Sequence, residues 1–324
     1  MRTIRSVMQG RLFDRQIPVW LSWPITNRCN YRCSYCGRPD HNDGEIPTRR
    51  ALEIVDEFAD LGTRYVFLSG GEPLVRADLP VIIERCRQRR LFICLTTNGA
   101  LYLQRKKDIG RINMLKLSLD GPESVHDRYR ASGAYAKVIQ VLEDASRDQL
   151  PVILNAVVST ASLPYLEDLV ALAKRYKAII KFQPINTIQA GNRNIENLML
   201  SGEQHRFLSA RLRKLKFRTG VIGNTLAGID TIGRLPAGGD MVCYARRIFV
   251  YLTSDGSLFP CSKRNEIAEP QSCAGTPVAR ALKNVPRVSC RTCFCTSDAE
   301  LNLLMRFRPR DILSILPQAM ARGV

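Results

Sequence analysis

The sequence predicts an α/β fold built on a parallel sheet that is open or curled toward a barrel. From residue 17 to about 217, short apolar runs alternate with longer stretches whose apolar residues recur every three or four positions, as at Leu52, Val55, Phe58 and Ala59. Six successive strand–helix units require right-handed crossovers, and such crossovers make neighbouring strands parallel.

The order of the elements follows from these runs. The expected strands are the apolar runs 19–25, 65–68, 92–96, 114–119, 152–158 and 179–184. The expected helices have amphipathic spacing and cover 48–61, 78–89, 102–109, 132–148 and 164–176. In such folds, ligand sites gather at the carboxyl ends of the strands. The first strand ends just before Cys29, so we expect the cysteines that follow to lie on a loop at that end.

The character of the chain changes near residue 218. Glycines and turn residues crowd positions 220–239, and six of the eleven cysteines fall between 243 and 295. We therefore expect two domains: residues 1–217 form the strand–helix core, and residues 218–324 form a small, loop-rich, cysteine-rich domain with the C-terminal tail.

Composition narrows the class of protein. The 324 residues are 45% hydrophobic and 24% charged, as in ordinary globular proteins. No apolar run approaches the ~20 residues of a membrane span, and no signal peptide begins the sequence, so we expect a cytoplasmic protein. In that compartment, eleven cysteines indicate metal or redox chemistry rather than disulfides.

The net charge of +18 could attract nucleic acid. The basic residues, for example those in 206–218, are dispersed and are not interleaved with aromatic residues that could stack on bases. We therefore interpret them as solvated helix faces and expect no stable nucleic-acid partner.

Three cysteines, Cys29, Cys33 and Cys36, follow the first strand with the spacing C-x3-C-x2-C. Structural zinc sites take four ligands, and no second CxxC lies between Cys36 and Cys94. Thiolates also hold iron–sulfur cubanes, and three of them leave one iron open to a small molecule. The spacing and its place resemble the radical S-adenosylmethionine (SAM) superfamily, in which SAM binds the fourth iron.

Further motifs at the ends of later strands strengthen this resemblance. Ser69-Gly70-Gly71-Glu72-Pro73 is similar to the family's GGEP motif, which contacts the methionine amino group of SAM. Glycine has no side chain, so it would let the ligand approach the backbone. Thr96-Thr97-Asn98-Gly99 is similar to the family's TNG motif.

The fourth strand is followed by residues similar to the family's SxDG and HDxxR motifs, here Ser118 to Gly121 and His126 to Arg130. The resemblance implies that Ser118 and Arg130 approach the methionine carboxylate, which the planar fork of an arginine can bind through two hydrogen bonds. It also places Tyr35 against the adenine and Asn155 near the ribose.

The resemblance covers roughly residues 17–190 and implies a partial (β/α)6 TIM-like barrel. It implies that a reduced [4Fe-4S] cluster, supplied with electrons by a flavodoxin- or ferredoxin-type donor, cleaves SAM to a 5′-deoxyadenosyl radical. That radical abstracts hydrogen from the substrate, while the protein orients the substrate and excludes water.

The tail resembles the SPASM and twitch auxiliary domains of this superfamily. Cys243 and Cys261 match C-x12-G-x4-C, with a hairpin expected over 251–261, and Cys290, Cys293 and Cys295 follow. The resemblance implies one auxiliary [4Fe-4S] cluster held by Cys243, Cys261 and two of the last three cysteines. A zinc knuckle on the same residues is the alternative. Cys86 and Cys94 are expected to be buried apolar residues.

The substrate remains open between a peptide and a small metabolite. An auxiliary cluster implies net oxidation or bond formation. Only 28 residues precede Cys29, so we expect no leader-peptide-binding domain before the barrel. A different class of function is a non-enzymatic, zinc-stabilised nucleic-acid-binding protein that uses the basic charge.

Overall fold

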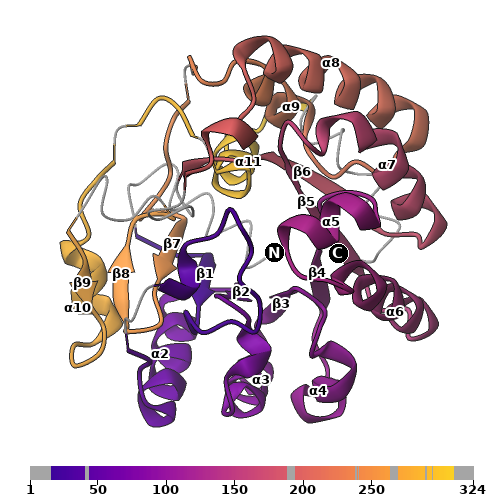
Figure 1. The fold of residues 1–324 in the computed structure, drawn as a ribbon. Helices are drawn as coiled ribbons and strands as arrows, with labels where there is room; N and C mark the ends of the chain where they lie inside the picture. Colours follow the sequence, from indigo (N-terminus) through magenta and orange to yellow (C-terminus); the bar gives the residue numbers. More distant parts are fainter. Residues whose placement is uncertain are drawn as a thin grey trace.

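The structure is a computed structural model, and it describes residues 16–40, 44–187, 194–237, 239, 241–262, 269–288, 290–293 and 295–309. Strands and helices alternate through the first two thirds of the chain (Figure 1). The strands are β1 (Trp20–Pro24), β2 (Tyr65–Ser69), β3 (Phe92–Thr97), β4 (Met114–Ser118), β5 (Val152–Val158) and β6 (Ile179–Pro184). The helices are α2 (Thr48–Leu61), α3 (Leu79–Gln88), α4 (Tyr102–Ile109), α5 (Glu123–Tyr129), α6 (Ala134–Arg147) and α7 (Leu166–Arg175).

The described strands form one nine-stranded sheet in the order β6-β5-β4-β3-β2-β1-β7-β8-β9. Strands β1 to β6 are parallel to their neighbours, and β7 (Phe249–Leu252) adds to β1 in parallel. Strands β8 (Ser257–Phe259) and β9 (Gln271–Ser272) continue the sheet as an antiparallel hairpin edge. Figure 1 shows the sheet curled into an open barrel with helices on its outer side.

Each helix is held by an apolar stripe that faces the sheet. In α2, Ala51, Ile54, Val55 and Phe58 are buried, and full burial of one large apolar side chain is worth about 1.5–3 kcal/mol. The helix ends at Gly62, whose φ of 106° is a left-handed conformation that glycine adopts without strain.

The two faces of the sheet differ in accessibility. Along β2, β4 and β5, buried residues alternate with partly exposed ones. Because side chains of a strand alternate between faces, one face packs under the helices and the other lines the inner side of the barrel. The inner side is therefore the accessible face.

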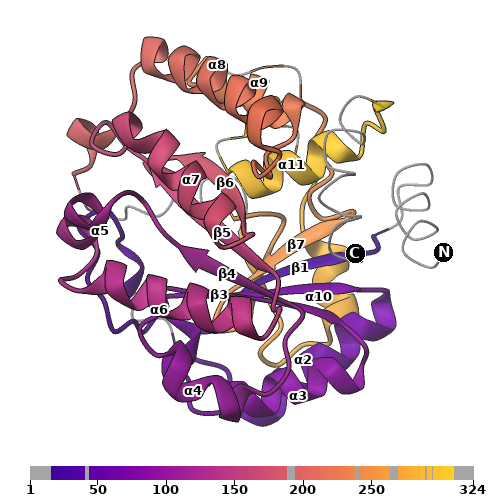
Figure 2. The same cartoon turned by 90° about the vertical axis from the view of Figure 1, so that its right-hand side faces the viewer.

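After β6 the chain forms α8 (Gly202–Thr219), α9 (Leu226–Gly233), α10 (Val278–Asn284) and α11 (Thr296–Leu304). Figures 1 and 2 show α11 on the open side of the barrel, close to β6 and β7. Apolar residues of α11 pack both against Phe249 and Val19 and against Met241 near α9. Helix α11 thus connects the last strands with the barrel.

The structure confirms the six expected strands and five expected helices to within two residues at each end. It also confirms that the hairpin and the cysteine loop lie where they were expected, and that Cys86 and Cys94 are buried. Helices α5, α9, α10 and α11 were not expected, whereas α8 covers the basic run 206–218 that was interpreted as a solvated helix face. The boundary at residue 217 stays a prediction, although β7 to β9 extend the same sheet as the core. No described helix has the length and apolar character that crossing a membrane requires.

Candidate active site

The cysteine loop follows β1 and packs tightly against the turn after β2. The amide of Gly71 donates to the carbonyl of Thr26 at 2.8 Å, and the amide of Glu72 donates to the carbonyl of Arg28 at 2.9 Å. A Cβ added to Gly71 would lie 2.3 Å from the Arg28 carbonyl oxygen, and one added to Gly70 would lie 2.3 Å from that of Thr26. These glycines therefore allow a close approach to the cysteine loop, while the approach of SAM to the same backbone stays a prediction.

Two of the three thiols of this loop are partly exposed and the third is buried. Cys29 and Cys36 are partly exposed and Cys33 is 9% exposed. Burial raises the pKa of Cys33 to about 11 and also raises the pKa of Cys29. A bound cation would reverse this effect, because metal coordination deprotonates thiols. Three thiols are a donor set that fits a cluster with one open iron.

Glu72 joins the cysteine loop to the next strand end. Its side chain is fully buried; Oε1 accepts from the Thr97 hydroxyl at 2.9 Å, and Oε2 accepts from the Asn98 amide at 2.8 Å. Burial raises the pKa of Glu72 to about 7. The side-chain amide of Asn98 in turn donates to Asn30 Oδ1 at 2.8 Å. Pro73 follows directly and opens a short 3-10 turn.

Asp120 is the centre of a second network, at the end of β4. Arg130 binds it through two hydrogen bonds, Nε to Oδ2 at 2.6 Å and Nη2 to Oδ1 at 3.1 Å. The Tyr35 hydroxyl donates to the same carboxylate at 2.6 Å, and the Val157 amide donates at 3.0 Å. Burial alone would raise the pKa of Asp120, but the charge and hydrogen bonds of Arg130 hold it below its usual range.

Sequence reasoning missed Asp120, although it lies inside the motif that begins at Ser118. The acidic residue itself was the signal in the sequence. It lies two positions after a serine at a strand end, where it can pair with a nearby arginine. The structure brings Tyr35 and Arg130 together on the Asp120 carboxylate, a contact that the sequence did not predict. Ser118 and Asn155 are register partners on β4 and β5, and both are partly exposed.

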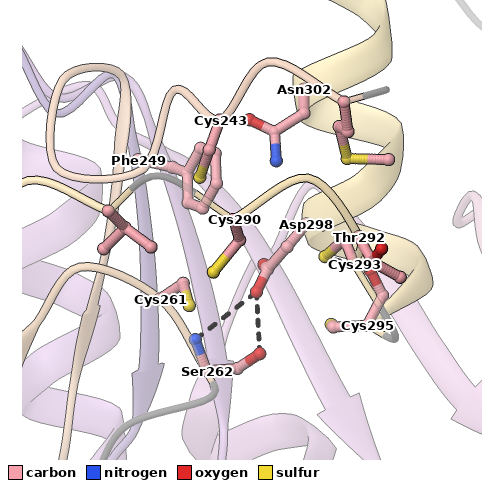
Figure 3. Close-up of a pocket in the computed structure, with 12 residues that line it drawn as sticks. Cys243, Phe249, Cys261, Ser262, Cys290, Thr292, Cys293, Cys295, Asp298 and Asn302 are labelled. Carbon is pink, nitrogen blue, oxygen red and sulfur yellow. Dashed lines mark hydrogen bonds between the residues drawn. The ribbon is translucent and has the colours of Figure 1, made fainter. Parts of the chain in front are cut away.

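A second group of cysteines lines a pocket beside α11 (Figure 3). Cys243 precedes β7, Cys261 follows β8, and the other three cysteines lie just before α11. The five that line the pocket are Cys243, Cys261, Cys290, Cys293 and Cys295. Cys273 is fully buried in the main core and does not line this pocket.

Polar residues of α11 fix the walls of this pocket. Asp298 Oδ2 accepts from the Ser262 hydroxyl at 2.7 Å, which ties α11 to the segment after the hairpin. Asn302 Oδ1 accepts from the Tyr244 amide at 2.7 Å, which ties it to the segment after Cys243. Figure 3 shows Asp298 between Cys290 on one side and Cys293 and Cys295 on the other.

No three Cys, His, Asp or Glu side chains in the described part of the chain are close enough to hold a single metal ion. The thiols that hold a cubane lie farther apart than those around one metal ion, because each thiolate binds a different iron. Five thiols around one pocket therefore fit a cluster better than a zinc ion.

Comparisons with known proteins agree with this geometry. The family model described as "Radical SAM superfamily" matches residues 23–179. "Mycofactocin maturase MftC" of Mycobacterium ulcerans is 28% identical over 255 residues, which cover 75% of this chain and 68% of that protein. "PqqA peptide cyclase" of Granulibacter bethesdensis is 26% identical over 257 residues, 75% of this chain and 67% of that protein.

Among solved structures, SuiB of Streptococcus suis bound to precursor peptide SuiA superposes with a TM-score of 0.68 at 16% identity. The match covers 88% of this chain and 68% of SuiB, and it shows a shared fold. The chain spans between 43% and 68% of the length of the curated relatives that it matches.

Proposed function

This chain belongs to the radical SAM superfamily and is an enzyme, and from that premise we propose that it modifies a peptide by hydrogen abstraction. Membership implies a [4Fe-4S] cluster and SAM as cofactors. When bound, they supply a 5′-deoxyadenosyl radical that removes hydrogen from an unactivated carbon. The non-enzymatic, nucleic-acid-binding alternative is set aside.

The observation that carries the proposal is the meeting of the cysteine loop with the ends of four strands. Cys29, Cys33 and Cys36 would hold the cluster, beside the turn at Gly70 and Gly71. SAM would then lie over the inner ends of β2 to β5. Its contacts would include Glu72, Pro73, Asn98, Ser118 and Asn155.

Arg130 has one role set by its neighbours and another that we propose. Two of its nitrogens, Nε and Nη2, are engaged by Asp120. Nη1 makes no hydrogen bond to a described residue. It is therefore the nitrogen that would donate to the SAM carboxylate. Tyr35, fixed by the same Asp120, would present its ring toward the adenine.

A peptide is the substrate class that the relatives favour. The name of PqqA peptide cyclase states that it acts on a peptide, and that match extends to 75% of this chain, well beyond the SAM-binding half. The sequence left both a peptide and a small metabolite open as the substrate. Because the relatives favour a peptide, we propose a peptide.

The second cysteine group would hold an auxiliary [4Fe-4S] cluster through Cys243, Cys261, Cys290 and Cys293. Cys295 is the spare thiol in this assignment. Burial raises its pKa to about 12, and its thiol hydrogen-bonds with Ser262 and the backbone of Asp298, whereas its backbone carbonyl accepts from the Cys293 thiol at 3.4 Å. Burial also raises the pKa of Cys293, whose thiol lies near both Cys295 and Cys261. The cluster would accept an electron from the substrate or bind it, which supports net oxidation or bond formation.

The test is anaerobic reconstitution with iron and sulfide. Wild type should carry about eight irons per chain, four for each cubane, and should form 5′-deoxyadenosine from SAM with dithionite. Replacing Cys29, Cys33 and Cys36 together by Ala should leave about four irons and no 5′-deoxyadenosine. The matched control is Cys273→Ala in the core, which should keep both. 5′-Deoxyadenosine formation by the triple variant would refute the assignment.

Peptides encoded beside the gene test the substrate class. Incubation with SAM and reductant should give a dehydrogenated or cross-linked peptide, detected by mass spectrometry. If SAM cleavage is efficient but is stimulated only by a small metabolite, the peptide assignment is wrong.

A further inference from the structure

Two lysines project from the inner face of the sheet, Lys116 on β4 and Lys181 on β6. Their neighbours along the strands, among them Leu117 and Phe182, are fully buried under the helices, so the lysines face the opposite, inner side. Both lysines are partly exposed there. Asn155 on β5 lies between the two strands and is the register partner of Lys181.

The two ammonium groups approach the same part of the barrel interior. Burial lowers the pKa of Lys116, and the positive charge of Lys181 lowers it further. Both lysines also lie close enough to Cys94 to act on its pKa. Two like charges therefore converge on one accessible region.

Neither lysine has a carboxylate partner within 4 Å in the described part of the chain. Among the described residues, Lys116 Nζ hydrogen-bonds to the Ser297 hydroxyl alone, at 3.5 Å. Two acids of α11 interact with the lysines at longer range only. Asp298 accepts from the Ser262 hydroxyl at 2.7 Å, and Glu300 Oε1 accepts from the Thr225 amide at 2.9 Å, while Glu300 Oε2 has no hydrogen bond to a described residue. Converging cations without direct partners are favourable sites for an anionic ligand.

We propose that Lys116 and Lys181 bind a carboxylate of the substrate inside the barrel. The inference rests on the proposed peptide substrate, which can offer the side chain of an acidic residue or its C-terminal carboxylate. The site would hold the peptide by an ionised group while a neighbouring carbon faces the SAM side of the barrel.

Three small probes of nearly equal shape test this. N-acetyl-glutamic acid α-amide carries a side-chain carboxylate, N-acetyl-glutamine carries an α-carboxylate, and N-acetyl-glutamine amide carries no charge. Calorimetry on the reconstituted enzyme should give millimolar binding of at least one charged probe, and about tenfold weaker binding of the neutral one. The charged probe that binds more tightly identifies the source of the carboxylate.

Variants locate the site. Lys116→Met and Lys181→Met should each weaken binding of the charged probe about tenfold, the loss expected for one charged hydrogen bond. The matched control is Lys214→Met, at an exposed position on α8, which should bind like wild type. Thermal unfolding checks that each variant is folded, and the comparison of the three probes on wild type stands without any variant.

Equal affinity for all three probes, or binding unchanged in both lysine variants, would overturn the inference. Tighter, lysine-dependent binding of inorganic phosphate would also overturn it, because the site would then suit a phosphate. If wild type cleaves SAM in any of these cases, only this inference fails. If wild type forms no 5′-deoxyadenosine, the proposed function fails instead.

Discussion

The cysteine loop and the five-cysteine pocket bring thiols together in different ways. The loop takes its three cysteines from eight consecutive residues, whereas the pocket collects five from segments between 243 and 295. The loop is shaped by backbone hydrogen bonds to the turn at Gly71 and by the networks around Glu72 and Asp120. The pocket is shaped mainly by α11, through Asp298 and Asn302.

This difference indicates which interactions each site needs to keep its geometry. A local motif on a rigid strand end keeps its geometry as long as its supporting contacts remain. A site assembled from distant segments depends on metal binding to hold the segments together, because metal binding contributes to folding free energy. The following variants test that contrast.

The largest effect is expected in the pocket. Cys293→Ala should lose the second cluster, about four of eight irons, and with it peptide product. Cys295→Ala, two residues away, should retain the iron, because its thiol faces Ser262 and Asp298. Iron analysis and the cluster absorption band measure the outcome. Retained iron in Cys293→Ala together with loss in Cys295→Ala would reverse the ligand assignment.

In the network that supports the loop, Arg130→Met should leave the Asp120 carboxylate buried without its partner. The pair is 9% and 4% exposed, and breaking a buried ion pair costs about 3–5 kcal/mol. Urea unfolding measures the change. The control, Arg128→Met on the exposed side of α5, should cost less than about 1 kcal/mol. A loss for Arg130→Met as small as the control's would show that the pair does not support the site.

A smaller loss is expected where the cysteine loop meets the turn. The new Cβ in Gly71→Ala would meet the Arg28 carbonyl at 2.3 Å, and forced overpacking costs about 1–3 kcal/mol. The displaced loop should also slow 5′-deoxyadenosine formation. Gly275→Ala is the matched control, since nothing lies within 4 Å of its Cβ position. Equal stability and equal rates in the two variants would contradict close packing at Gly71.

The smallest effect is a pH dependence from His126, which is fully buried and accepts from the Asp120 amide through Nδ1 at 3.1 Å. Burial lowers its pKa from 6.5 to about 4. The unfolded chain therefore takes up a proton before the folded one, so the stability from neutral His126 is full above pH 6.5 and is lost as the pH falls toward 4.

Between pH 7 and pH 5 this amounts to about 2 kcal/mol. Urea unfolding at both pH values should show that loss in wild type and a smaller one in His126→Asn, whose side-chain oxygen can accept the same hydrogen bond. Because other groups titrate alike in both proteins, identical pH slopes would mean that His126 is not the cause.

The sequence by itself determined the alternating fold and the position of the first three cysteines. Local apolar spacing predicts the strand–helix alternation, and both ends of β5 were predicted where the structure has them. Cys29, Cys33 and Cys36 lie on one loop because they are neighbours in sequence. The motif residues at later strand ends follow from the same rule, since parallel strands bring their carboxyl ends to one edge.

Only the tertiary structure decided what distant residues do to one another. It placed Asp120 between Tyr35 and Arg130, set Gly71 against the Arg28 carbonyl, and buried Cys273 in the core, away from the other five cysteines of the C-terminal part. It also brought α11 to the five cysteines and turned Lys116 and Lys181 into the barrel. Local spacing encodes which face of its own element a residue occupies, but not which residues of other elements it meets, because those contacts depend on how the whole sheet curls and packs.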